Sequence, residues 1–341
     1  MVQIDFIKEI AKYGLENDQA KLLASLNELI DHARKTKKIN FALQLQSILR
    51  ESIRHQQTNG LVKSDSPQFH LREEDKEMRD LVFEKLTSSY SFNDLVCPQD
   101  VMDELSYLIK EHACIDVLNK FELPISNKIL FYGPPGCGKT LASYVLAGEL
   151  EKMMMVVNLG AIVSSKLGET SKNLSKIFRR AFSEDCIIFI DEFDTLGKVR
   201  DYSQDHGEMK RVVNTILQLF DYLPKTSVVI AATNQIDMID NALLRRFDAK
   251  INLSLPEEGL IKKLIDRTLK SGLIKLDKKN SQEKIISACK GLSYYSIQKT
   301  LITTVKRSLI MRASSSNAPP KVDTDMWLAL VGKEKESLNA M

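Results

Sequence analysis

A single short loop contains the residues of this 341-residue chain that are best suited to chemistry. It reads Gly-Pro-Pro-Gly-Cys-Gly-Lys-Thr from Gly133 to Thr140 and fits the spacing GxxxxGK(S/T). Glycines in these places let backbone N–H groups turn towards phosphate oxygens, and a following helix adds its positive end. Lys139 is expected to reach the outer phosphates, and Thr140 to bind Mg²⁺. We expect nucleotide contacts from Gly133, Pro134, Pro135, Gly136, Cys137, Gly138, Lys139, Thr140 and Leu141.

Two adjacent carboxylates follow an apolar run further along the chain, where Ile187–Ile190 precedes Asp191 and Glu192. Charges after a buried strand are tolerated at the C-terminal edge of a parallel sheet, which is where such sheets bind ligands. Asp191 is therefore predicted to complete the Mg²⁺ shell. Glu192 is predicted to be the general base that accepts a proton from the attacking water. A plain strand end is the alternative, and the preceding phosphate loop argues against it.

Two further candidate sites follow in the sequence. Asn234 ends a third apolar run and is predicted to orient water against the terminal phosphate, the alternative being an ordinary turn residue. Arg245 and Arg246 are adjacent, so they cannot both serve one small site. One of them is predicted to reach the nucleotide of a neighbouring subunit as an arginine finger, and the alternative is a solvated basic pair.

Short β-branched runs alternate with helical patterns from about residue 90. This alternation predicts an α/β fold in which a parallel sheet has helices on both faces. No strand pattern recurs after Pro256, so the remainder is predicted to be helical. Apolar stripes at helical spacing predict helices in 1–56, and the charged stretch from Arg72 to Leu86 is also predicted to be helical. The predicted strands are 128–132, 155–159, 186–190, 227–232 and 250–253.

These patterns divide the chain into four segments. Residues 1–56 are predicted to form a helical bundle that recruits a partner or substrate, the alternative being that its apolar stripes form only its own core. Residues 57–89 are predicted to be a linker and a helix. An α/β domain is expected over 90–256, and a helical lid with a C-terminal tail over 257–341.

The composition is that of an ordinary globular protein, with 43% hydrophobic and 27% charged residues. A net charge of +3 excludes a chain-wide basic field of the kind that coats nucleic acid, although the part from Leu260 onward carries 16 basic and 7 acidic residues. No apolar run approaches the ~20 residues that cross a bilayer. The five cysteines are scattered without a CxxC pair, which predicts a reduced, cytoplasmic protein without a structural metal.

Taken together, the motifs resemble those of the AAA ATPases, a branch of the AAA+ superfamily, over about residues 90–310. Residues 91–96 (Ser-Phe-Asn-Asp-Leu-Val) look like the family's lead-in segment, so Asp94 and Val96 are expected beside the adenine. GPPGCGKT, IIFIDEFD, AATN and residues 240–248 match the Walker A, Walker B, first sensor and arginine-finger regions. The resemblance implies strand order 5-1-4-3-2, a four-helix lid, ATP with Mg²⁺, and a ring, usually a hexamer.

The chain departs from the family's pattern in three places. A lysine stands where the central pore loop usually has an aromatic residue, which puts polypeptide threading in doubt. Tyr294 and Tyr295 replace a Gly-Ala pair of the lid, and they could stack near the adenosine or simply pack. Cys97 replaces a glycine of the lead-in segment. The pore-loop positions are Lys166, Leu167 and Gly168.

A narrower resemblance, carried by residues 168–173 and 205–219, is to bacterial single-module AAA proteins. These are often encoded beside a subtilisin-like serine protease in an anti-phage arrangement. The leading hypothesis is therefore a Mg²⁺-dependent ATP hydrolase ring that remodels or regulates a protein partner such as that protease, with no role for a membrane. One alternative is a nucleotide-gated switch with slow hydrolysis, favoured by Lys166. Another is a DNA-acting AAA+ motor, to which the basic C-terminal quarter points.

Overall fold

The computed structural model describes residues 6, 8–10, 12–13, 19–35, 81–163, 169–195, 206–269, 275–277, 282–312 and 321–339. Near the N-terminus, α2 (Gln19–Lys35) confirms one of the expected helices, and its Leu29 and Ile30 are buried. Phe6 packs against His32, with ring centroids 5.6 Å apart. Residues 14–18 and 36–80, which contain the predicted linker and much of the predicted bundle, fall outside the described residues, as does the pore loop.

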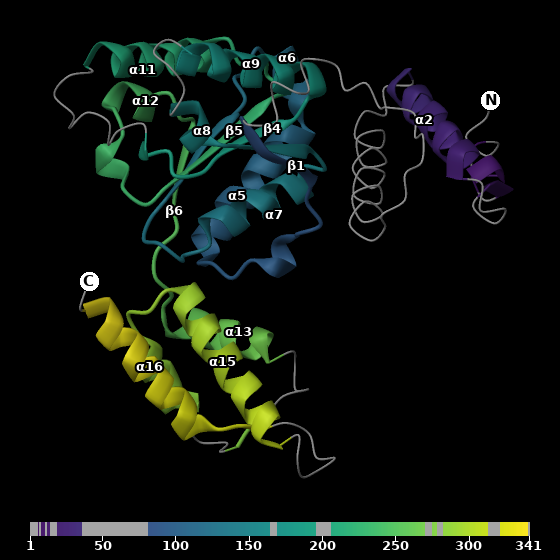
Figure 1. The fold of residues 1–341 in the computed structure, drawn as a ribbon. Helices are drawn as coiled ribbons and strands as arrows, with labels where there is room; N and C mark the ends of the chain where they lie inside the picture. The colour runs from purple at the N-terminus through teal and green to yellow at the C-terminus, as the bar shows by residue number, and fades with distance from the viewer. Residues whose placement is uncertain are drawn as a thin grey trace.

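The central sheet contains β1 (Val82–Thr87), β2 (Lys128–Tyr132), β3 (Met153–Val157), β4 (Ile187–Ile190), β5 (Val228–Thr233) and β6 (Ala249–Asn252). Their order is β1-β3-β4-β5-β2-β6 (Figure 1). The strands β2 to β6 are parallel, and among themselves they have the expected order 5-1-4-3-2. β1 pairs antiparallel with β3, so the prediction of a helix extending to Leu86 was wrong at its end. The added strand gives the edge of β3 a hydrogen-bonded partner.

Alternating side chains of each strand face two separate hydrophobic cores. On β2, Ile129 and Phe131 pack into one core and Leu130 into the other. The parallel strands are thus buried on both faces, as their uninterrupted apolar runs predict. One face carries α5 (Gln99–Ala113) and α7 (Lys139–Glu149); the other carries α9 (Glu169–Glu184), α11 (His206–Asp221) and α12 (Asn241–Leu244) (Figure 1). Shorter elements are η1 (Phe92–Asp94), α6 (Ile115–Lys120), α8 (Leu159–Val163) and η3 (Ile236–Met238).

The lid follows Pro256 and consists of α13 (Glu258–Thr268), α14 (Gln282–Cys289), α15 (Tyr294–Arg312) and α16 (Thr324–Asn339). Its centre is Trp327, which is fully buried and whose Nε1–H donates to Oγ1 of Thr300 at 3.2 Å. The expectation that no strand follows Pro256 was wrong, because β7 (Lys275–Leu276) and β8 (Lys321–Val322) form a parallel pair. A strand of two residues is too short to leave a period in the sequence.

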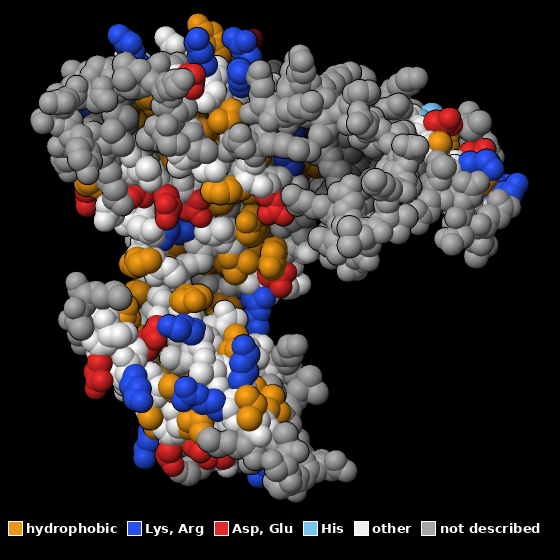
Figure 2. Space-filling view, viewed as in Figure 1, with side chains coloured by type: hydrophobic (Ala, Val, Ile, Leu, Met, Phe, Trp, Pro, Cys, Tyr) orange, Lys and Arg blue, Asp and Glu red, His pale blue; other side chains and the backbone are white. Residues whose placement is uncertain are grey.

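The lid and the α/β domain share a hydrophobic core. Leu264, Tyr294 and Ile297 of the lid belong to the same buried cluster as Val96 and Phe131 of the α/β domain. In Figure 2 the molecule narrows between the two parts, hydrophobic side chains lie at this waist, and Lys and Arg side chains are spread over the lid. The lid is therefore joined to the sheet mainly by apolar contact.

Candidate nucleotide-binding site

The glycine-rich loop joins β2 to α7, and its backbone requires glycine at specific points. Gly133, Gly136 and Gly138 have φ angles of 137°, 73° and 90°, which side-chain-bearing residues rarely adopt. A Cβ on Gly133 would also lie 2.3 Å from the carbonyl oxygen of Leu253. Because α7 begins at Lys139, the strand–loop–helix arrangement predicted from the motif is present, and the first N–H groups of α7 are available to an anion.

The side chain of Lys139 is buried within this loop, with 7% of the residue exposed. Its Nζ donates to the carbonyl oxygens of Gly133 and Pro134, both at 2.8 Å. Burial lowers the pKa of this ammonium below its ordinary value, and the nearby carboxylate of Asp191 opposes that change. An ammonium has three N–H donors, so the third is left for an oxygen of a bound phosphate.

Thr140 and Asp191 are brought together from two separate elements. The Oγ1 of Thr140, in the first turn of α7, donates to Oδ2 of Asp191, just beyond β4, at 3.0 Å. A hydroxyl beside a carboxylate is a donor set that suits Mg²⁺, which takes oxygen ligands and keeps several waters. No group of three or more His, Cys, Asp or Glu that could hold a metal occurs in the described residues. Thr140 and Asp191 are therefore the candidate protein ligands of a magnesium ion here.

Glu192 occupies an unusual backbone position at the same edge of the sheet. Its φ is 52°, in the left-handed region that costs a side-chain-bearing residue roughly 1–3 kcal/mol. Its N–H donates to Oδ1 of Asp191 at 2.8 Å, and its side chain is exposed. The next residue, Phe193, is buried and donates its N–H to the carbonyl of Ala232 on β5 at 2.8 Å. The strained turn therefore directs the Glu192 carboxylate away from the core.

Asp194 is a residue of this site that the sequence reasoning did not single out. It is 3% exposed, and its Oδ1 accepts a hydrogen bond from Oγ1 of Thr233 at 3.0 Å. The same Oγ1 accepts the N–H of Gln235 at 3.0 Å. These bonds tie the turn after β4 to the end of β5. The available signal was a second aspartate at the end of the IIFIDEFD motif.

Asn234 lies at the end of β5, the strand next to β4, and its side chain is exposed. Parallel neighbouring strands end at one edge of a sheet, so Asn234 and Glu192 share that edge. Asn234 thus lies at the edge of the sheet that also carries Asp191 and Glu192, and its action on a water molecule remains a prediction.

The two adjacent arginines differ in their contacts. Both follow α12, whose N-terminus is capped by the carboxylate of Asp240 accepting the N–H of Ala242 at 2.7 Å. Nη2 of Arg246 forms an ion pair with Asp221 at 3.2 Å. Arg245 is exposed, and in the described ranges it has no ion-pair partner. Both guanidinium groups are thus accessible, and of the two only Arg246 has an ion-pair partner among the described residues.

The lead-in segment is held between the α/β domain and the lid. Asp94 accepts the N–H of Ser91 at 2.9 Å and forms an ion pair with Nη2 of Arg267, on α13, at 3.0 Å. Val96 and Cys97 are buried, and burial raises the pKa of the Cys97 thiol to about 11. The carboxylate of Asp94 therefore links the segment to the lid, and its expected contact with a nucleotide remains a prediction.

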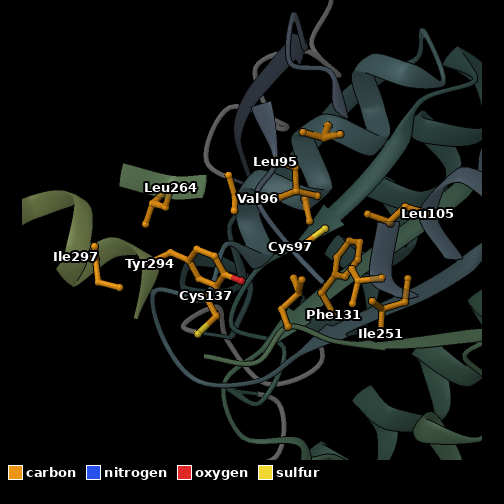
Figure 3. Close-up of a cluster of buried hydrophobic side chains, with 14 of the residues drawn as sticks. Leu95, Val96, Cys97, Leu105, Phe131, Cys137, Ile251, Leu264, Tyr294 and Ile297 are labelled. Atoms are coloured by element: carbon orange, nitrogen blue, oxygen red, sulfur yellow. The ribbon is translucent and has the colours of Figure 1, made fainter. Parts of the chain in front are cut away.

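The lid meets the glycine-rich loop directly at Gly136. The N–H of Tyr295 donates to the carbonyl of Gly136 at 3.1 Å, and a Cβ on Gly136 would lie 2.7 Å from Oγ of Ser293. Tyr294 is buried beside Cys137 and Val96, whereas Tyr295 is exposed (Figure 3). Tyr294 therefore packs between the lid and the α/β domain, and the alternative position beside the adenosine stays a prediction.

Two further expectations concern the pore loop and membrane-spanning helices. Lys166, Leu167 and Gly168 lie outside the described residues. Among the helices that are described, none is long and apolar enough to cross a membrane.

Comparisons with known proteins place this geometry in a family. The model of the ATPase family associated with various cellular activities (AAA) matches residues 129–255. An uncharacterized AAA family ATPase of Sinorhizobium fredii is 32% identical over 305 residues, which cover 89% of this chain and 88% of that protein. A putative 26S proteasome regulatory subunit homolog of Methanocaldococcus jannaschii is 33% identical over a stretch that covers 51% of this chain and 47% of that protein. An ATP-dependent zinc metalloprotease FtsH 2 of a Thermoanaerobacter species is 36% identical over a stretch that covers 50% of this chain and 34% of that protein.

Among solved structures, the crystal structure of the FIGL-1 AAA domain aligns with a TM-score of 0.61. The alignment covers 81% of this chain and 96% of that one at 18% identity. At this identity the likeness concerns the fold alone. It supports the α/β architecture with an appended helical lid.

Proposed function

Because the chain belongs to the AAA family of ATPases, we propose that it hydrolyses ATP with Mg²⁺ and, as a ring, uses this cycle to remodel or regulate a protein partner. The observation that carries the proposal is the contact between Thr140 and Asp191, with the exposed carboxylate of Glu192 one residue further on. A metal-binding pair and a candidate base therefore lie at one sheet edge, beside the loop that contains a buried lysine.

The proposed reaction assigns a separate task to each side chain. Lys139 and the N–H groups of the loop bind the phosphates, while Thr140 and Asp191 hold Mg²⁺, which when bound neutralises phosphate charge. The oxygen of a water attacks the terminal phosphorus, and the Glu192 carboxylate accepts the proton that this water loses. The bond from that phosphorus to the bridging oxygen breaks, which gives ADP and phosphate. Asn234, at the end of the neighbouring strand, orients the water.

The ring is proposed to complete the site. Arg245 is exposed and lies outside the ion pair that holds Arg246 to Asp221, so it is able to reach a nucleotide bound by a neighbouring copy. A hexamer is the expected assembly. The charge of the chain supports self-assembly, because the basic part after Leu260 and the more acidic remainder provide complementary edges.

The partner is proposed to be a protein with protease activity. Two of the similar proteins are named as a proteasome regulatory subunit homolog and an ATP-dependent metalloprotease. This sequence contains no HExxH zinc motif. A separate subtilisin-like protease in a bacterial anti-phage system is the partner we propose, recruited by residues 1–56. All five cysteines are free, in keeping with the proposed cytoplasmic location.

A nucleotide-gated switch with slow hydrolysis is the second candidate, and it is favoured by Lys166 at the pore-loop position. A lysine lacks the apolar ring that would grip a passing chain. Robust ATP-driven unfolding of a tagged, stably folded substrate by this protein alone would exclude the switch and favour the remodelling ring.

The proposal is tested by Glu192→Gln. Loss of the base should lower ATP turnover by roughly 10²–10⁴-fold while ATP binding persists, because the amide keeps the shape of the side chain but accepts no proton at neutral pH. Turnover is measured by phosphate release, and binding by calorimetry. Lys139→Ala is the matched control and should lose binding itself. Unchanged turnover in Glu192→Gln would refute the catalytic assignment.

A further inference from the structure

The direction in which a bound nucleotide runs is inferred from contacts at two places on the glycine-rich loop. Thr140, the last residue of the loop, contacts Asp191, and this side is proposed to hold the metal and the terminal phosphate. The middle of the loop contacts the lid, because Gly136 accepts a hydrogen bond from the backbone of Tyr295. With the terminal phosphate on the side of Thr140, we take the nucleoside to lie on the lid side, at the junction of loop, lid and lead-in segment.

Tyr294 occupies this junction. It is 8% exposed and belongs to the same buried cluster as Val96 and Cys97 of the lead-in segment and Cys137 of the loop. Figure 3 shows its ring beside Cys137, with the hydroxyl pointing away from Leu264 and Ile297 of the lid. The side chain thus crosses from the lid to the α/β domain at the place where the nucleoside is expected.

The hydroxyl of Tyr294 is a buried polar group without a hydrogen-bond partner in the described part of the chain. A buried donor left unsatisfied destabilises the state that contains it, so such groups require an explanation. Burial, together with Cys97, Cys137 and Glu257, raises the pKa of this phenol above its ordinary value. The group is therefore a neutral phenol at physiological pH and is able to donate.

We propose that the Tyr294 hydroxyl donates a hydrogen bond to an acceptor atom of the nucleoside, so that Tyr294 is a residue that determines affinity and selectivity for the nucleoside part of the ligand. The inference rests on the proposed function, because it takes a nucleoside triphosphate as the ligand. The lid contacts the loop through one backbone hydrogen bond at Gly136, so a small displacement of α15 brings a ligand within reach of the phenol. Binding then satisfies a donor that has no hydrogen-bond partner among the described residues.

The test compares the wild type with Tyr294→Phe, which keeps the ring and removes only the hydroxyl. Three probes are titrated by calorimetry: ATP, 2′-deoxy-ATP and inorganic tripolyphosphate, each with Mg²⁺. The variant should bind ATP about threefold to tenfold more weakly, the usual contribution of one hydrogen bond. It should bind tripolyphosphate, which has no nucleoside, as the wild type does. The melting temperature of the ligand-free variant should be unchanged or higher, because the unsatisfied hydroxyl is gone.

Each binding result either supports or overturns the proposed hydrogen bond. An equal loss with ATP and 2′-deoxy-ATP supports an acceptor on the base or elsewhere on the sugar, and a loss confined to ATP supports the ribose 2′-oxygen. Unchanged ATP affinity of Tyr294→Phe overturns the proposal, and so does an equal weakening of ATP and tripolyphosphate binding. Tighter ATP binding by Tyr294→Ala also overturns it, because the ring would then occupy the place of the nucleoside. The test reads binding alone, so failure of Glu192→Gln to slow hydrolysis leaves this inference standing. Absence of ATP binding by the wild type overturns both.

Discussion

The glycine-rich loop has different surroundings on two sides. The sheet side, at Thr140, is polar and consists of groups at the C-terminal ends of β4 and β5, where hydrogen bonds from Thr140, Thr233 and the backbone of Glu192 fix the two aspartates. The lid side, at Gly136, is largely apolar and consists of Tyr294 with Val96 and Cys137. The sheet side belongs to a single sheet, whereas the lid side joins two parts of the molecule.

On the sheet side, the strands that carry the candidate catalytic groups are buried on both faces, so we expect these groups to keep one arrangement. On the lid side, the contacts join two parts of the molecule, so we expect them to change when a ligand binds. We therefore expect substitutions near the sheet to act on rate and folding, and substitutions near the lid to act on affinity.

The largest effect is expected from Arg245→Ala. An arginine finger lost from a neighbouring site should lower ATP turnover roughly 10³-fold with little change in ATP affinity. Arg246→Ala is the matched control and should change turnover by less than about fivefold, because an exposed ion pair such as that with Asp221 contributes little. Steady-state turnover at concentrations that favour assembly decides between them. The reverse ranking would make Arg246 the finger.

An intermediate effect is expected from Gly133→Ala. Gly133 directly follows β2 and Gly136 contacts the lid, so alanine at each position compares the two places by the folding free energy that is lost. A Cβ on Gly133 would meet the backbone oxygen of Leu253 at 2.3 Å in a left-handed conformation, so we expect a loss of about 2–4 kcal/mol of folding free energy. Gly136→Ala faces Oγ of Ser293, a side chain that can rotate, and should cost about 1–2 kcal/mol. Denaturant unfolding measures both. A larger loss of folding free energy for Gly136→Ala than for Gly133→Ala would show that the lid side is the more rigid.

The smallest effect is expected from Arg267→Ala. The ion pair with Asp94 joins the lid to the lead-in segment, but both side chains are more than a third exposed. Its removal should cost about 0–1 kcal/mol and change ATP affinity by less than about threefold. Thermal unfolding and ATP titration check this. A tenfold change in affinity would mean that this ion pair, rather than the apolar junction around Tyr294, positions the lid.

The sequence predicted much of the sheet and site because their signals are local. Five apolar runs indicated the parallel strands, and glycines before Lys139 indicated a loop of unusual φ angles. β1 and the pair β7 and β8 were missed, because short or edge strands are stabilised by pairing with distant residues rather than by their own pattern. Asp194 was missed because its hydrogen-bond partner, Thr233 at the end of β5, is 39 residues away and no local pattern indicates the contact.

By itself, the sequence determined which groups can do chemistry: Lys139, Thr140, Asp191 and Glu192 follow from residue type and spacing, because a phosphate loop and an acidic strand end are local motifs. The tertiary structure decided how adjacent residues differ. Among the residues that the structure describes, Arg246 has an ion-pair partner whereas Arg245 has none, and the buried hydroxyl of Tyr294 has no hydrogen-bond partner whereas Tyr295 is exposed. Neighbours in sequence receive different environments because burial and pairing depend on residues far away in the chain.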